Sequence, residues 1–184
     1  MTPSNTRGQA RVAVAALLLA FAFTIVSPVI ADERSRLTEE VTEARATFVQ
    51  KDPSLEKEMS AAAGYALFPG VGKGGIGIGG AHGTGQVMFK GGPIAKATLT
   101  QVSIGLQLGG QKYAELILFQ NRDALDSFLT GSFTMSAQAT AVAAASGAAA
   151  NAKYSGGVKV ITMAIGGLMY EASVGGQKFN ITKY

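Results

Sequence analysis

The stretch Gly75-Ile-Gly-Ile-Gly79 alternates strictly between glycine and isoleucine. Neighbouring side chains of a strand point to opposite faces, so this period of two predicts a strand. Both isoleucines would share one face, and a glycine track would occupy the other. A second alternating stretch lies between Thr98 and Leu108, where the aliphatic residues Val102, Ile104, Leu106 and Leu108 alternate with Gln101, Ser103, Gly105 and Gln107. It predicts a long strand with one apolar face and one wet or small-residue face.

Glycine-rich turns separate the other strands expected near these two. Upstream, Tyr65–Phe68 forms a short strand that ends at the turn Pro69-Gly70. Downstream, a turn at residues 79–83 leads into the strand Gln86–Lys90, and a further turn follows at residues 91–93.

The second half of the chain continues the same pattern. Tyr113–Phe119 is nearly continuous in apolar residues and is predicted to be a central strand. An alanine-rich strand is expected from Met135 to about Ser146, and another strand from Val158 to Ile165. After a bend at Gly166-Gly167, residues 168–174 alternate again.

Helices are predicted at the beginning of this region and at one later site. From Asp32 to Gln50 an apolar stripe recurs at helical spacing, formed by Leu37, Val41, Ala44 and Phe48. Asp52 and Pro53 suit the cap and first residue of a second helix, whose Leu55 and Met59 share a face. Asn121 is expected to cap a short helix near residues 121–130, with Leu125, Phe128 and Leu129 facing inward and Gly131 ending it.

These elements predict an α+β fold. Its main part is a β-rich, antiparallel, curved sheet or small barrel, preceded by N-terminal helices and carrying the short helix near residues 121–130. Glycines and alanines inside the strands indicate tight curvature or close packing on one face. Residues 33–63 form the helical lead of the domain, and residues 64–184 form its β-rich part.

Residues 1–31 have the parts of a secretory signal peptide. Arg7 and Arg11 precede an uncharged segment from Val12 to Ala31, which contains an apolar run, Pro28 and a final Val29-Ile-Ala31. A basic start, an apolar middle and small residues at a cleavage site predict export, with residues 32–184 as the mature domain in the periplasm or cell envelope. The alternative is an uncleaved membrane anchor, because about 20 apolar residues are enough to span a bilayer.

Charge is distributed unevenly along the mature chain. Residues 32–60 carry a net charge of −3, and residues 61–184 carry +5. A basic β-rich part suits anionic partners such as phospholipid head groups, although ordinary solubility would also account for it. The basic segments do not interleave arginine with aromatic residues, so nucleic acid is not expected as a partner.

Catalytic and cofactor chemistry is poorly supplied. The chain has one histidine and no cysteine, so a nucleophile with its base would have to be built on His82. No cluster of acidic residues and histidine suggests a metal site. Gly75–Gly80 matches G-x-G-x-x-G literally, but the sequence after it does not start a helix, as a dinucleotide site requires. We therefore expect no enzyme, no catalytic residue, no metal and no cofactor.

Three blocks of the sequence resemble the SYLF domain family. They are Ala63–Gly85, which opens with Ala-Gly-Tyr-Ala-Leu-Phe-Pro, the central block Ser103–Asn121, and the closing block Ile165–Gly176. The resemblance covers nearly the whole of residues 33–184, in order, and implies a lipid-binding module whose closing block is a hairpin. Eukaryotic relatives bind phosphoinositides, and some fungal relatives bind actin filaments. Two stretches, Gly92–Thr98 and residues 141–150, depart from the family's usual pattern.

For an exported protein the resemblance implies affinity for anionic phospholipid or the membrane surface. Lys73 lies within a matching motif and is the first candidate for contact with a lipid head group. Lys90, Lys96 and His82 follow because they are near it along the chain, and Lys73, Lys90, Lys96 and Lys112 are expected at strand ends or turns. The alternative function is that of a structural or scaffolding envelope protein, which binds another protein through its glycine-rich sheet face.

Overall fold

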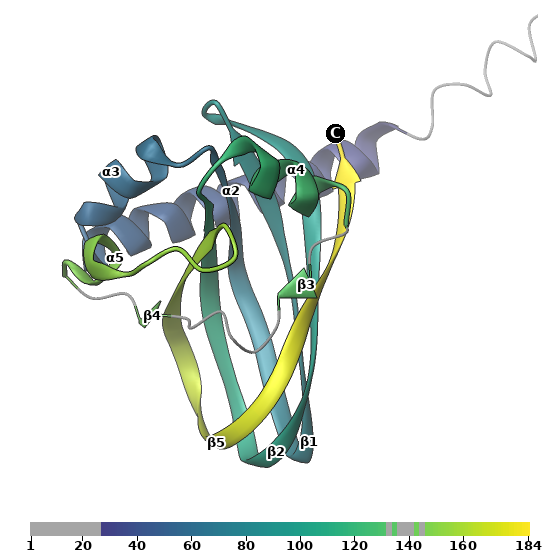
Figure 1. The fold of residues 1–184 in the computed structure, drawn as a ribbon. Coiled ribbons are helices and arrows are strands. Elements are labelled where there is room, and N and C mark those ends of the chain that lie inside the picture. The colour runs from purple at the N-terminus through teal and green to yellow at the C-terminus, as the bar shows by residue number, and fades with distance from the viewer. Residues whose placement is uncertain (1–26, 132–133, 136–141, 144–145) are drawn as a thin grey trace, which may run out of the picture. The chain divides into compact units, whose positions relative to one another are not determined.

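The computed structural model describes residues 27–131, 134–135, 142–143 and 146–184. The chain divides into two units, residues 1–36 and residues 37–184. In the first unit the described residues 27–36 form the beginning of helix α2 (Ser27–Lys51). Residues 1–26 of the predicted leader are not among the described residues. The second unit holds the sheet and the remaining helices (Figure 1).

The second unit is built around three very long strands. They are β1 (Gly64–Phe89), β2 (Gly92–Phe119) and β5 (Val158–Lys183), which pair antiparallel in the order β1-β2-β5. The two-residue strands β3 (Thr134–Met135) and β4 (Val142–Ala143) flank β5, the first antiparallel and the second parallel. The predicted α+β class with a curved, mainly antiparallel sheet is confirmed, and the hydrogen-bonded path ends at β1 and β3 without closing.

Several turns expected from the sequence are wrong, because the strands pass through them. Pro69-Gly70 lies in a bulge of β1 between Phe68 and Val71, which an edge strand tolerates because one side of its backbone has no partner. The expected turn at residues 79–83 is paired strand, and Gly166-Gly167 lies beside a register shift within β5. The closing block is therefore part of one strand and not a hairpin. The β1–β2 turn uses Lys90 and Gly91, with φ angles of 50° and 82°.

The three long strands fold back at a common end of the sheet, as Figure 1 shows. In β1 the fold-back is at Gly75–Gly79, where Gly77 has a φ of 71° and the register shifts between Ile76 and Ile78. The two halves of β1 then approach so closely that a Cβ atom on Gly85 would overlap the carbonyl oxygen of Leu67. The glycine track predicted from the sequence is thus the line along which the sheet folds. We call this end of the sheet the apex. The first sheet half comprises residues 64–75, 109–119 and 158–169, and the second comprises residues 79–89, 92–103 and 175–183.

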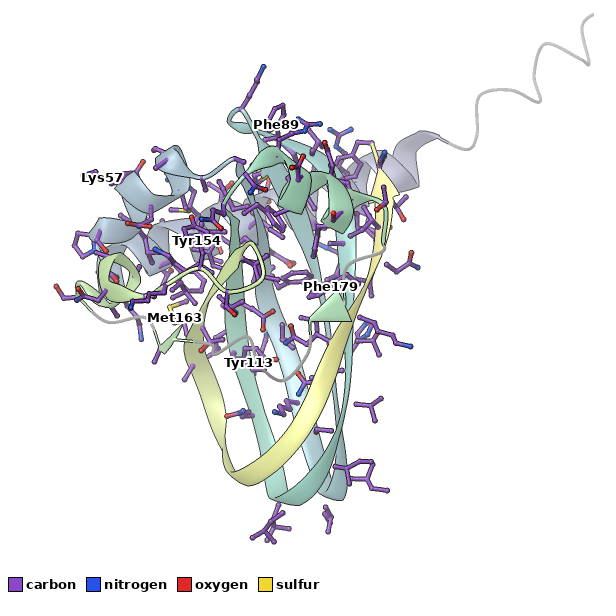
Figure 2. The ribbon with its side chains drawn as sticks, in the orientation of Figure 1. Lys57, Phe89, Tyr113, Tyr154, Met163 and Phe179 are labelled. Carbon is purple, nitrogen blue, oxygen red and sulfur yellow. The ribbon has the colours of Figure 1, made fainter. Side chains whose placement is uncertain are left out.

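Two hydrophobic clusters hold the second unit together. One fills the space between the two sheet halves and includes Phe68, Phe119 and Phe179, with helix α4 (Arg122–Leu129) packed against it. The other lies on the outer face of the first sheet half, under helices α2 and α3 (Ser54–Ala61). In Figure 2 Phe179 lies between the sheet halves, and Met163 lies on the helix side.

The predicted helices are confirmed in their positions and buried faces. Leu37, Val41 and Phe48 of α2 are buried, as are Leu55 and Met59 of α3. Asn121 caps α4 by accepting a hydrogen bond of 2.9 Å from the backbone N–H of Ala124, which satisfies one of the free N–H groups of the first turn. The buried side chains of α4 are the predicted Leu125, Phe128 and Leu129, and Gly131 follows with a φ of 70°.

Buried polar groups attach the short helix α5 (Ala148–Asn151) to α3 and β5. The carboxylate of Asp52 accepts hydrogen bonds from the backbone N–H groups of Gly147 (3.0 Å) and Ala149 (2.8 Å) and from Ser54. Lys159, also buried, forms an ion pair of 2.6 Å with Glu58 and donates to the carbonyl of Ala149. The strand expected from Met135 to Ser146 falls mostly outside the described residues, apart from its ends in β3 and β4.

Candidate functional site

The apex exposes large aliphatic side chains. Six of them lie on β1 and β2, with exposed fractions between 61% and 80%: Ile76, Ile78, Val102, Ile104, Leu106 and Leu108. Among the residues with described side chains, the other large hydrophobic residues that are exposed are Ile165 and Tyr184. The exposed apolar side chains are therefore concentrated at one end of the sheet.

Strand register makes these residues one patch. Ile76 pairs with Leu108 and Ile78 pairs with Ile104, so their side chains are direct cross-strand neighbours on one face. Val102 and Leu106 share that face at alternating positions of β2. Six neighbouring aliphatic side chains form an exposed apolar surface on the order of several hundred Å², a size that is common for interaction sites. We call these six residues the apolar apex.

Of the described residues between the aliphatic positions, Ser103 is buried and Gln101 is half-buried, so the face predicted to be wet or made of small residues is enclosed in the structure. Ser103 is 1% exposed, while its neighbours Val102 and Ile104 are exposed. The fold-back explains why the aliphatic side chains point outward. Near the apex the space between the sheet halves is narrow, and it holds small or polar side chains next to the glycines. The aliphatic residues are left on the outside.

A hydrogen-bonded polar cluster fills part of this interior. The side-chain amide of Gln177 donates to the carboxylate of Glu115 (3.0 Å) and to the side-chain oxygen of Gln101 (3.3 Å). Burial of the Glu115 carboxyl raises its pKa to about 7, although the hydrogen bond from Gln177 and the positive charge of Lys73 act in the opposite direction. The region beneath the apolar apex is thus polar inside and apolar outside.

Basic side chains flank the apolar apex on the second sheet half. His82, Thr100 and Lys178 are cross-strand partners in one row, and all three are exposed. Thr100 is two residues from Val102 and on the same face, so the row lies about 7 Å along β2 from the aliphatic residues. The three long strands carry two acidic residues. Glu115 is buried, and Glu171 of β5 pairs in register with Gln107 of β2.

The structure does not bring the four predicted lipid contacts together. His82 lies in the exposed row beside the apolar apex, and Lys73 is half-buried near Glu115. Lys90 occupies the β1–β2 turn with its ammonium 5.3 Å from the centre of the Phe89 ring, and Lys96 pairs in register with Gln86. Thirteen residues separate Gly77 from Lys90, a distance of about 40 Å along the strand.

The expected position of these lysines was also partly wrong. Lys73, Lys96 and Lys112 lie within long strands, and of the four only Lys90 lies in a turn. Sequence reasoning also missed the aliphatic residues of the apex. The sequence signal that could have found them is the glycine track opposite the isoleucines. A strand face made only of glycine has no side chains with which to build a core.

The arrangement offers little for catalysis or cofactor binding. Gly75–Gly80 lies inside a strand at the fold-back, so no helix N-terminus meets it as a dinucleotide site would need. Within the described residues no group of three or more acidic and histidine side chains is placed to hold a metal ion. Among those same residues, no helix is both long and apolar enough to cross a bilayer.

Comparison with known proteins agrees with the central and closing sequence blocks. Residues 100–183 match the Ysc84 family. The family is described as a Las17-binding protein actin regulator, and the match covers most of β2 and all of α4 and β5. The Ysc84 domain is the same domain as SYLF, so the resemblance to the SYLF family is confirmed for residues 100–183.

A bacterial protein is also similar to part of this chain. The chain is 32% identical over 76 residues to Beta cell expansion factor A of Aeromonas veronii. The aligned region covers 41% of this chain and 29% of the relative, so the chain spans under a third of that protein's length. The Ysc84 segment includes four of the six residues of the apolar apex, on β2.

Proposed function

We propose that this protein is an exported, non-enzymatic lipid-binding protein that contacts anionic phospholipid at a membrane surface of the cell envelope. The observation that carries the proposal is the apolar apex. Aliphatic side chains with exposed fractions above 60% gain free energy when they leave water, at about 25 cal/mol per Å² of apolar area. A lipid surface provides a medium for all six at once.

The charge around the apex supports an anionic surface. When the aliphatic residues enter the acyl region, the row of His82 and Lys178 reaches the level of the head groups. Each basic residue near an anionic leaflet contributes about 1 kcal/mol, and this contribution decreases at high salt. The segment preceding residue 32 would deliver the protein to this compartment as a cleaved signal peptide.

A lipid-binding role is consistent with the matched family, whose members bind lipid or actin-related partners. The alternative role is that of a structural protein that binds another protein of the envelope. Such a partner would use the same apolar patch, because the glycine faces at Gly83 and Gly85 are enclosed between the sheet halves.

Co-sedimentation with vesicles tests the proposal. Residues 32–184 are used, because the apolar leader would bind vesicles by itself. We expect sedimentation with vesicles that contain phosphatidylglycerol or cardiolipin, weaker sedimentation with phosphatidylcholine alone, and partial release by high salt. Absence of binding to any vesicle at low salt would refute the lipid proposal and favour the protein-partner role.

A further inference from the structure

A groove opens between helix α2 and the first sheet half, on the outer face of the sheet. Its described lining combines three charged residues, Glu40, Glu43 and Lys112, with apolar residues that include Leu37, Met163 and Ile165. Its volume is about 530 Å³, within the range of about 300–1,000 Å³ that is usual for sites of small molecules. Neither the apolar apex nor the basic row includes any of these charged residues.

The charged residues of the groove come from different elements. Glu40 and Glu43 are three residues apart and lie on the same side of α2, whereas Lys112 comes from β2. All three are exposed, and the stem of Lys112 lies over the backbone at Gly70. The lining thus has carboxylates on one wall and an ammonium group on the other.

This arrangement selects for a ligand with both charges. A purely anionic head group is repelled by two carboxylates, and a simple cation offers Lys112 no hydrogen-bond acceptor. A zwitterion whose ammonium donates hydrogen bonds to the carboxylates, and whose phosphate accepts one from Lys112, satisfies all three groups. A quaternary ammonium has no N–H to donate, so the carboxylates favour a primary amine.

The apolar residues of the groove indicate that the ligand also has hydrocarbon chains. Ile165 lines the groove and is itself 49% exposed on β5, next to the position where Lys112 pairs with Gly166. From there the surface of the same sheet half continues toward Leu108 and Ile76 of the apolar apex, about four residues along the strands. A lipid with its head group in the groove would extend its chains toward the surface that we propose to enter the membrane.

We propose that the groove binds phosphatidylethanolamine, with its ammonium at Glu40 and Glu43 and its phosphate at Lys112. This inference rests on the proposed function, since it names a lipid that the same domain recognises. It adds a head-group site that is separate from the general attraction of basic residues to anionic membranes.

Titration calorimetry with dihexanoyl phospholipids, kept below their micelle concentration, tests the groove without a membrane. The full-length chain is used, because its leader is then common to every variant. We expect saturable binding of dihexanoyl phosphatidylethanolamine and at least about 10-fold weaker binding of the phosphatidylcholine and phosphatidylglycerol analogues. Equal affinity for the three lipids, or no binding of the first, would overturn the proposal.

Substitutions locate the site. The double variant Glu40→Gln/Glu43→Gln and the variant Lys112→Ala should each weaken binding of dihexanoyl phosphatidylethanolamine by about 10-fold or more, since each loses charged hydrogen bonds. The matched controls are Glu39→Gln, on α2 outside the described lining, and Lys153→Ala, an exposed lysine after α5. Both should bind like the wild type. Unchanged affinity in the groove variants would refute the assignment.

Two further comparisons separate this inference from its alternatives. Free phosphoethanolamine should bind at least about 10-fold more weakly than the lipid, and equal affinity would refute a site for a whole lipid. In residues 32–184 the apex variant Ile104→Thr/Leu106→Thr should lose most of its vesicle binding, and in the full-length chain it should keep its affinity for the short-chain lipid. If vesicle binding persists in the groove variants while the wild type shows no preference for the amine lipid, the groove assignment fails and the proposed function stands.

Discussion

Replacing two aliphatic residues of the apolar apex with threonine should weaken membrane binding strongly and leave folding intact. In the double variant Ile104→Thr/Leu106→Thr the changed side chains have exposed fractions of 68% and 64%, so no core contact is lost. Threonine is β-branched and suits a strand as well as isoleucine does. Surface substitutions of this kind change the free energy of unfolding by about 0.5 kcal/mol or less.

The loss of membrane affinity follows from the exposed area. Complete burial of a leucine or isoleucine side chain contributes about 1.5–3 kcal/mol, and about two-thirds of each side chain is available here. Because threonine keeps one methyl group, each substitution costs about 1–1.5 kcal/mol of transfer free energy, and the pair costs about 2–3 kcal/mol. The partition coefficient into vesicles should therefore fall by about 30- to 150-fold.

The assay is vesicle co-sedimentation of residues 32–184 over a series of lipid concentrations, with urea unfolding as a check of stability. The control variant Ile104→Val/Leu106→Val keeps the patch apolar and should lose much less affinity, by about 10-fold at most. A double threonine variant that partitions like the wild type, with an unchanged unfolding midpoint, would show that the apolar apex does not enter the membrane.

Three further predictions concern the polar interior and the fold-back. Glu115 has a folded pKa of about 7 against 4.5 for an unperturbed carboxyl, so its contribution to stability should be complete below about pH 4.5 and fall by about 3 kcal/mol as the pH rises to 7. In Glu115→Gln the free energy of unfolding, measured with urea, should no longer fall with pH over this range. A fall that persists would show that another group causes it. Asp52→Ala should lower the free energy of unfolding by about 2–4 kcal/mol, because the N–H groups of Gly147 and Ala149 lose their acceptor. Burial opposes ionisation of Asp52, but the hydrogen bonds from Ala149, Ser54 and Gly147 lower its pKa overall. Its contribution is therefore present above about pH 3.8 and lost as the pH falls through the lowered pKa, a loss that Asp52→Ala should no longer show. Gly85→Ala should destabilise by about 1–3 kcal/mol because its Cβ would overlap Leu67, whereas Gly72→Ala has open space and should unfold like the wild type.

Much of the local structure follows from side-chain patterns alone. The apolar stripe of α2, the cap at Asn121 and the inward face of α4 all appear as predicted, because each depends on spacing within about one or two helical turns. The alternation at Gly75–Gly79 likewise predicted a strand with both isoleucines on one face. Such features are set by backbone periodicity and by neighbouring hydrogen bonds, which do not depend on the rest of the fold.

Which face of that strand points outward was decided only by tertiary structure. Alternation assigns Ile76 and Ile78 to one side, but in most sheets that side is the core. Here the sheet folds along its glycines, and near the apex its interior holds Ser103, Glu115 and the half-buried Gln101, while the hydrophobic cluster between the halves lies farther from the fold-back. The distance between Lys73 and Lys90 could not be predicted from the sequence either. It depends on the length of the continuous strand between them, which the sequence pattern had divided by turns. The aliphatic residues are exposed because of long-range packing between strand halves, which no local pattern specifies.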